Sequence, residues 1–99
     1  MAARTPPKKS SQQKPLLSIC IPTQDHPLLL KNCLTHLEKA AKTFPHIEVV
    51  VVDGSKNDAS QKVATRFPFV SYYRQEGWDA TDKYLASMLY AQGTYLLYM

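Results

Sequence analysis

The chain has 99 residues, of which 44% are hydrophobic and 20% are charged, and its formal net charge at pH 7 is +4. A chain of this length builds at most one domain around one small core. The sequence has no long uncharged apolar run, so we expect an ordinary globular protein without a membrane span.

The positive charge is concentrated at the start of the chain. Residues 1–15 contain no acid and four of the twelve basic residues, which are Arg4, Lys8, Lys9 and Lys14. The other eight basic residues are balanced by the eight acids of the chain. The Pro, Ser and Gln content of residues 1–15 favours a disordered basic tail over a phosphate- or membrane-binding arm. This tail never becomes an apolar signal segment, so we expect a cytoplasmic location. The neutral remainder does not indicate nucleic-acid binding.

The first predicted elements are a strand and a long helix. Residues 16–21 are apolar with β-branched members, and Pro22 ends the run, which is typical of a buried strand. Asp25 then supplies a helix cap and Pro27 an early-helix proline. Apolar residues recur at helical spacing from there to Phe44, which predicts a helix with one face in the core.

The next run is the most apolar in the chain. Residues 47–53 are almost wholly β-branched, which predicts a central parallel strand covered on both faces. Gly54 and Ser55 are expected to turn the chain, and residues 57–67 predict a shorter helix.

A third strand, a third helix and a fourth strand follow at residues 69–73, 79–92 and 94–99, with Gly93 after the helix. The order βαβαβαβ requires right-handed crossovers and predicts an α/β fold, a parallel sheet with flanking helices. The chain stops inside its last strand, so we expect a truncated domain whose open strand edge favours self-association.

The common nucleotide and metal motifs are absent from the sequence: GxGxxG after the first strand, GxxxxGK[ST] and HExxH. Cys20 and Cys33 fit no metal or CxxC spacing and are expected to be reduced core thiols. Ligands of α/β sheets bind beyond the carboxyl ends of the strands. The candidate loops are therefore residues 23–25, 53–55 and 75–79.

Five segments follow one another along the chain: LSICIPT at residues 17–23, KNCL at 31–34, EVVVVDGSKND at 48–58, EGWDATDK at 76–83 and AQGTYLLYM at 91–99. In this order they resemble the opening of family 2 glycosyltransferases. The family typically reads IPTYN, L..CL.SL, EIIVVDGSSTDGT, GIYDAMNKG and A.GEYILFL in these places. The resemblance covers residues 16–99 and implies the N-terminal half of a GT-A type, Rossmann-like glycosyltransferase domain.

The resemblance also implies which residues bind the nucleotide-sugar donor: Pro22, Thr23, Asp53, Ser55, Asp79 and Lys83. It implies that Asp53 accepts the imide N–H of uracil, while Pro22 and Thr23 lie against the nucleoside. It implies that Asp79 meets ribose or sugar hydroxyls and that Lys83 offsets the diphosphate charge.

Structural alternatives exist for several of these side chains. Asp53 can instead cap the helix that begins near residue 57, and Asp79 and Lys83 can form an i,i+4 pair. Trp78 is either a pocket wall or a core anchor of the third helix. Gln24 and Asp25 replace the family's usual aromatic residue and Asn, so the resemblance does not extend to base stacking by this loop.

The implied reaction transfers a sugar from a nucleotide-sugar donor, preferably a UDP-sugar, to a hydroxyl of a saccharide or lipid-linked acceptor. A divalent metal, Mn or Mg, neutralises the diphosphate and a carboxylate acts as base. In the family the metal ligands follow the fourth strand, after Met99, so residues 1–99 alone are expected to be inactive. The alternatives are a non-catalytic nucleotide-binding or regulatory domain of the same fold and a receiver-type signalling domain. A receiver domain needs paired acids at the end of its first strand, which Ile21-Pro22-Thr23 does not provide.

Overall fold

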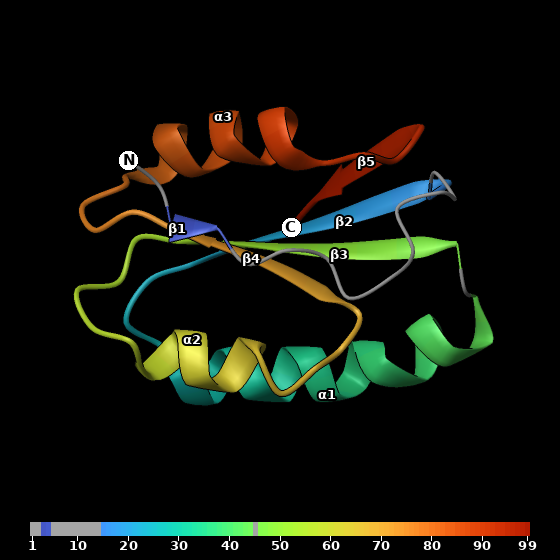
Figure 1. Ribbon diagram of the computed structural model, residues 1–99, viewed down its shortest axis with the longest axis horizontal. Helices are drawn as coiled ribbons and strands as arrows, with labels where there is room; N and C mark the ends of the chain where they lie inside the picture. The colour runs from blue at the N-terminus through green and yellow to red at the C-terminus, as the bar shows by residue number, and fades with distance from the viewer. Residues whose placement is uncertain (1–2, 5–14, 45) are drawn as a thin grey trace.

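A computed structural model describes residues 3–4, 15–44 and 46–99. Its elements in chain order are β1 (Ala3–Arg4), β2 (Leu17–Thr23), α1 (Pro27–Thr43), β3 (Ile47–Asp53), α2 (Ala59–Ala64), β4 (Val70–Arg74), α3 (Ala80–Tyr90) and β5 (Tyr95–Tyr98). They form a five-stranded sheet with the strand order β1-β4-β3-β2-β5. Helices α1 and α2 cover one face of this sheet, and α3 covers the other (Figure 1).

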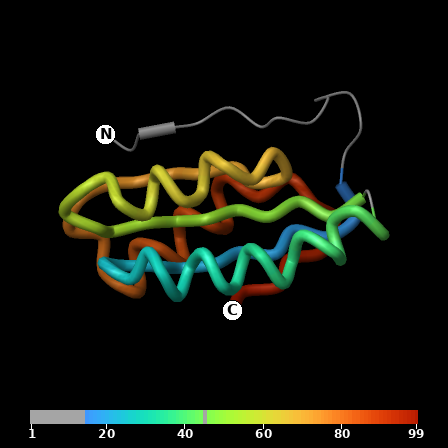
Figure 2. The backbone as a smooth tube through the Cα atoms, turned by 90° about the horizontal axis from the view of Figure 1, so that it is seen from below, coloured from blue at the N-terminus to red at the C-terminus, as the bar shows by residue number. Residues whose placement is uncertain are grey.

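The predicted α/β fold is confirmed. Strands β2, β3, β4 and β5 are mutually parallel, and each pair of consecutive strands is connected through a helix. Figure 2 shows α1 and α2 running side by side across their face of the sheet. No helix in the described part of the chain has the length and apolar content that a membrane span requires.

The antiparallel strand β1 was not expected, because two residues carry no hydrophobic pattern. It pairs with β4 through Ala3 opposite Arg74 and Arg4 opposite Tyr73. The rest of the predicted basic tail, residues 1–2 and 5–14, lies outside the described residues, so its disorder stays a prediction.

Two apolar clusters, one on each face, hold the layers together. Residues of β2, β3 and β4 alternate between them, because successive strand side chains point to opposite faces. The cluster under α1 and α2 contains Ile19, Ile21, Leu30, Leu34, Val49, Val51, Ala64, Val70 and Tyr72. The cluster under α3 contains Cys20, Val50, Val52, Tyr73 and Ala86, with Trp78 packed against it. Trp78 is therefore a core anchor of the α3 face.

Strand β3 is the centre of the sheet, as its composition predicted. The side chains of Val49, Val50, Val51 and Val52 are all fully buried. Full burial of a side chain of this kind stabilises the fold by roughly 1.5–3 kcal/mol. The alternation of neighbouring valines between two clusters explains why the run shows no polar face.

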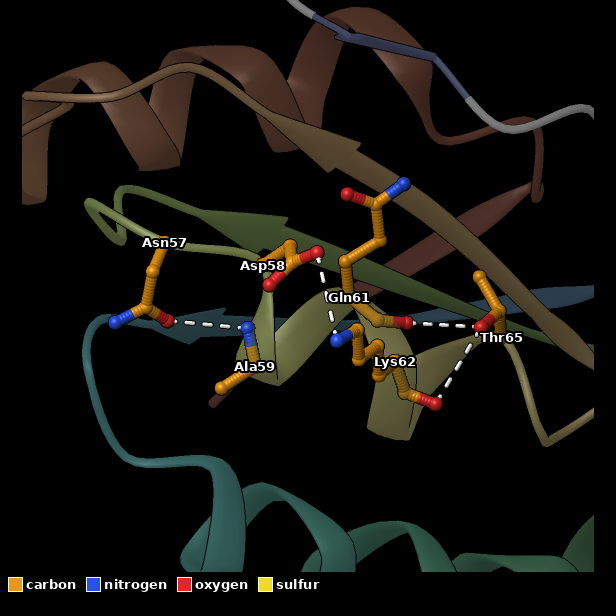
Figure 3. Close-up of polar contacts among 6 residues, drawn as sticks. All are labelled: Asn57, Asp58, Ala59, Gln61, Lys62 and Thr65. Carbon is orange, nitrogen blue, oxygen red and sulfur yellow. Dashed lines mark hydrogen bonds and ion pairs between the residues drawn. The ribbon is translucent and has the colours of Figure 1, made fainter.

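Helix α2 is shorter than the predicted span of residues 57–67. The side chain of Asn57 accepts a hydrogen bond from the Ala59 amide at 3.0 Å, which turns the chain before the helix begins. At the other end, Thr65 Oγ1 donates to the Gln61 carbonyl at 2.9 Å (Figure 3). Both residues are polar turn formers whose side chains compete with the helical hydrogen-bond pattern.

A buried carboxylate ties the α3–β5 connection to the sheet. Glu48 Oε1 accepts from Ser18 Oγ at 2.7 Å and from the Gln92 amide at 2.9 Å. Ser18 Oγ in turn accepts from the Gly93 amide at 2.8 Å. Glu48 is 6% exposed, so these bonds supply most of what water would otherwise provide. The chain thereby enters β5 at a fixed point.

Candidate functional site

A cavity of about 680 Å³ lies at the carboxyl ends of β2 and β5, next to the first turn of α3. Its walls are formed by Pro22, Thr23, Gln24, Asp25, His26, Leu29, Ala80, Lys83 and Tyr98. The chain adds β3 and β4 on one side of β2 and then β5 on the other. The cavity therefore lies where the strand order reverses, which is the usual ligand position in open α/β sheets.

The structure brings three of the six predicted donor-binding residues to this cavity. Pro22 and Thr23 line it from the end of β2, and Lys83 lines it from α3. Asp79 comes immediately before Ala80, another lining residue. Asp53 and Ser55 do not line the cavity.

Lys83 is the buried cation of this cavity. Its side chain is on the inward face of α3, and the residue is only 8% exposed. Its Nζ donates to Gln24 Oε1 at 3.2 Å. The alternative Asp79–Lys83 ion pair is wrong: within the described residues the only ion pair is Lys62–Asp58. Within the described residues the Lys83 ammonium is thus hydrogen-bonded to a neutral acceptor, and no carboxylate lies within ion-pair distance of it.

Asp79 is the N-cap residue immediately before α3, so the predicted helix start at residue 79 was one position early. Its side chain accepts from the Asp82 amide at 2.8 Å, and Asp82 Oδ2 accepts from the Asp79 amide at 3.1 Å. This reciprocal capping box fixes the first turn of α3. Asp79 is exposed, and its carboxylate keeps lone pairs for further donors.

Asp53 is fully buried at the end of β3. Its Oδ1 accepts from the Ser55 amide at 2.8 Å and from Ser55 Oγ, and its Oδ2 accepts from the Tyr72 hydroxyl. The side chain follows Val49 and Val51 on the face covered by α1 and α2. The alternative that Asp53 caps α2 is wrong, because the residue before that helix is Asp58 and Asp53 bonds elsewhere.

Tyr72 is a hydrogen-bond partner of Asp53 that the sequence did not reveal. It lies on β4, is 1% exposed, and belongs to the cluster under α1 and α2. Burial and the adjacent Asp53 carboxylate raise the pKa of the Tyr72 hydroxyl far above its usual value. The hydroxyl therefore stays protonated and donates. Only the pairing of β3 with β4 brings it to Asp53, and sequence pattern does not give that register.

Ser55 links Asp53 to the loop between β2 and α1. Ser55 is fully buried, and its Oγ accepts from the Asp25 amide at 2.7 Å. Asp25 Oδ1 accepts from the Lys56 amide at 3.2 Å. A chain of hydrogen bonds thus runs from Tyr72 through Asp53 and Ser55 to the rim of the cavity.

Asp25 does not cap α1, which corrects the sequence prediction. The residue before the helix is His26, and its side chain makes no capping hydrogen bond. Asp25 instead has a positive φ of 56°, a conformation that Asp and Asn adopt more readily than other non-glycine residues. Its side chain is used to join two loops rather than to begin a helix.

Gly54 allows the loops after β3 and β4 to approach each other. A Cβ at this position would collide with the Trp78 carbonyl oxygen and would lie 3.4 Å from Gln24 Oε1. Gln24 therefore lies over the end of β3 while it bonds Lys83. No side chain larger than hydrogen fits at residue 54 without moving one of these neighbours.

The two cysteines carry no site chemistry. Both thiols are free, and Cys20 is fully buried. Burial raises the pKa of the Cys20 thiol to about 11 and also raises the pKa of Cys33. The expectation of reduced core thiols agrees with this placement.

The described residues do not provide a metal site. Among residues 3–4, 15–44 and 46–99, no three His, Cys, Asp or Glu side chains come together as ligands. The resemblance puts the ligands of its divalent metal after Met99, so the metal stays a prediction, and no step of the chemistry is assigned to it.

The chain was compared with models of known protein families. A family model described as glycosyl transferase family 2 matches residues 18–99, which include β2 from its second residue on, every later element and all nine cavity-lining residues. Among proteins of curated function, none matches the chain. The match agrees with the resemblance found in the sequence and does not fit a receiver-type signalling domain.

Proposed function

Because the chain belongs to glycosyl transferase family 2, we propose that its cavity holds the nucleotide part of an activated sugar, with a UDP-sugar as the preferred donor. Family membership implies transfer of the sugar, and the acceptor that we propose is a hydroxyl of a saccharide or lipid-linked acceptor; residues 1–99 supply the nucleotide-binding part of this reaction. The observation that carries the proposal is the mostly covered side chain of Lys83, without a carboxylate partner among the described residues, in a cavity at the reversal of strand order.

Lys83 is the proposed partner of the diphosphate. The side chain of Lys83 is mostly covered, and its ammonium lines the cavity without a carboxylate partner, so an anion in the cavity would supply the charge that it lacks. Two of its three donors are not used by the bond to Gln24. A phosphate oxygen in the cavity would accept from them and supply the missing negative charge.

Thr23, Pro22 and Asp79 are the proposed contacts of the nucleoside and sugar. Pro22 and Thr23 line the cavity at the end of β2, where an apolar ring and a hydroxyl can lie against a base or ribose. Asp79 is held at the start of α3 by its capping box. Its exposed carboxylate can accept from ribose or sugar hydroxyls without leaving that position.

Asp53 is the proposed acceptor of the uracil imide N–H, and Ser55 is the residue that controls it. Both carboxylate oxygens are engaged and the side chain is buried. Binding of a base therefore requires the Ser55 hydroxyl to release Oδ1 and the carboxylate to turn toward the cavity. The backbone bond from the Ser55 amide would then hold the turned group.

Titration calorimetry of UDP, GDP and CMP, with and without manganese, tests this function on the chain and on its Asp53→Asn variant. We expect binding of UDP in preference to GDP, and loss of that preference in the variant because the amide offers the base a poorer acceptor. Circular dichroism controls for folding. Equal binding of UDP and GDP by the unsubstituted chain would contradict the uracil role of Asp53. Failure of the folded chain to bind any nucleotide would contradict the proposed function.

A further inference from the structure

Lys83 and Gln24 form a hydrogen-bonded pair in which the charge of the Lys83 ammonium has no carboxylate partner among the described residues. Lys83 is 8% exposed, and its charge meets only the amide oxygen of Gln24 at 3.2 Å. Gln24 is exposed, and this is its only side-chain hydrogen bond among the described residues. The neutral amide oxygen accepts from one of the three N–H donors of the ammonium and does not neutralise its positive charge.

The side chain of Gln24 is also placed so that it can move away from Lys83. Its neighbour Asp25 is anchored by the bonds to Ser55 and Lys56, so the loop backbone is held while the Gln24 side chain extends from it. The side chain lines the same cavity as Lys83. Rotation about side-chain bonds would withdraw the amide without moving the loop.

We propose that Gln24 sets the affinity of the cavity for phosphate. Its amide oxygen occupies the anion position at Lys83 when no phosphate is bound, and a phosphate oxygen of the donor displaces it. This inference rests on the proposed function only in taking the diphosphate as the ligand of Lys83. Gln24 acts on that ligand through Lys83 and is a positioning residue.

The exchange explains how the buried ammonium is tolerated in both states. Without phosphate, Gln24 replaces part of the lost hydration of Lys83. With phosphate, a charge-assisted bond replaces a neutral one, and such bonds are roughly twice as strong. The free energy gained at Lys83 on phosphate binding is the difference between the phosphate bond and the Gln24 bond that it replaces. The residue at position 24 therefore determines how much the Lys83 charge contributes to the affinity for the donor.

Two substitutions of Gln24 should change the affinity for UDP relative to uridine in opposite directions. Gln24→Ala removes the competing oxygen, so the affinity for UDP relative to uridine should rise severalfold. Gln24→Glu places a carboxylate against Lys83, so the same ratio should fall by about tenfold, because the phosphate must displace a charged group. Uridine has no phosphate, and its own Kd should change little in either variant.

The experiment measures Kd values for uridine and UDP by isothermal titration calorimetry on the chain and on its variants. Gln61→Glu is the matched control, because it adds the same charge on α2, away from the cavity. Lys83→Met keeps the length and apolar stem of the side chain and removes its charge. Thermal unfolding verifies that each variant is folded.

The outcomes separate the inference from the proposed function. A UDP-to-uridine preference that rises in Gln24→Ala, falls in Gln24→Glu and is unchanged in Gln61→Glu supports the inference. A preference that is lost in Lys83→Met but unchanged in both Gln24 variants overturns the role of Gln24 and leaves the phosphate site standing. No UDP-to-uridine preference in the unsubstituted, folded chain overturns both.

Discussion

The bond between Tyr72 and Asp53 makes the sharpest stability prediction. Tyr72→Phe keeps the ring in the cluster under α1 and α2 and removes only the hydroxyl that donates to Asp53 Oδ2. Asp53 is fully buried, so water cannot replace the lost donor. Hydrogen bonds to charged groups contribute about 1.5–3 kcal/mol, and we expect the free energy of unfolding to fall by about 2 kcal/mol.

Urea denaturation at pH 7, followed by circular dichroism, measures this change, and thermal unfolding gives a second readout. For a domain of this size, 1 kcal/mol corresponds to a Tm shift of about 4–8 °C, so the variant should melt roughly 10 °C lower. Tyr95→Phe is the control, since Tyr95 is 64% exposed and surface changes usually stay within about 0.5 kcal/mol. A Tyr72→Phe variant as stable as the Tyr95→Phe control would refute the argument.

Three further predictions concern the fold around the cavity. Gly54→Ala should lower the free energy of unfolding by about 2 kcal/mol or more in urea titrations, because its Cβ meets the Trp78 carbonyl oxygen. Glu48→Ala should cost about 3 kcal/mol by the same assay, since the buried Ser18 hydroxyl and the part-buried Gln92 amide lose their acceptor; a Glu48→Gln variant, which retains an acceptor oxygen, should recover part of that loss. Burial raises the pKa of Cys20 from 9.0 to about 11, so the native chain keeps a proton that the unfolded chain releases. Stability should therefore fall as the pH rises from about 9 to 11, and a Cys20→Ala variant that falls equally would argue against a buried thiol.

The sheet and its flanking helices could be predicted because each element has its own local signal. The span of β3 matches its prediction residue for residue, since a β-branched run between a proline and a glycine has unambiguous ends. The helix ends were less accurate because polar side chains compete there for backbone groups, as Asn57 does before α2.

The position of the cavity could be predicted only in part, and the partners of its side chains could not. Of the three candidate loops, residues 23–25 line the cavity, whereas residues 53–55 and 75–79 do not. The bond between Lys83 and Gln24 joins residues far apart in the sequence, and no local pattern identifies such a pair. The face of the sheet on which the Asp53 side chain lies could not be predicted for a different reason. Strand β3 is apolar on both faces, so its composition does not indicate on which face its last residue lies.

Strand β5 is the last element of the chain, yet it pairs with β2, with Leu17 opposite Tyr95. During synthesis, β2, β3 and β4 leave the ribosome with α1 and α2 before β5 has been made. At about 5–20 residues per second, translation of residues 75–99 takes roughly 1–5 s. For those seconds the nascent chain has a layer that can assemble on one face of the sheet and an open edge on β2. The ligand cavity is therefore completed only after the layer of β2, β3, β4, α1 and α2 has been made, because its walls from α3 and β5 follow later in the chain.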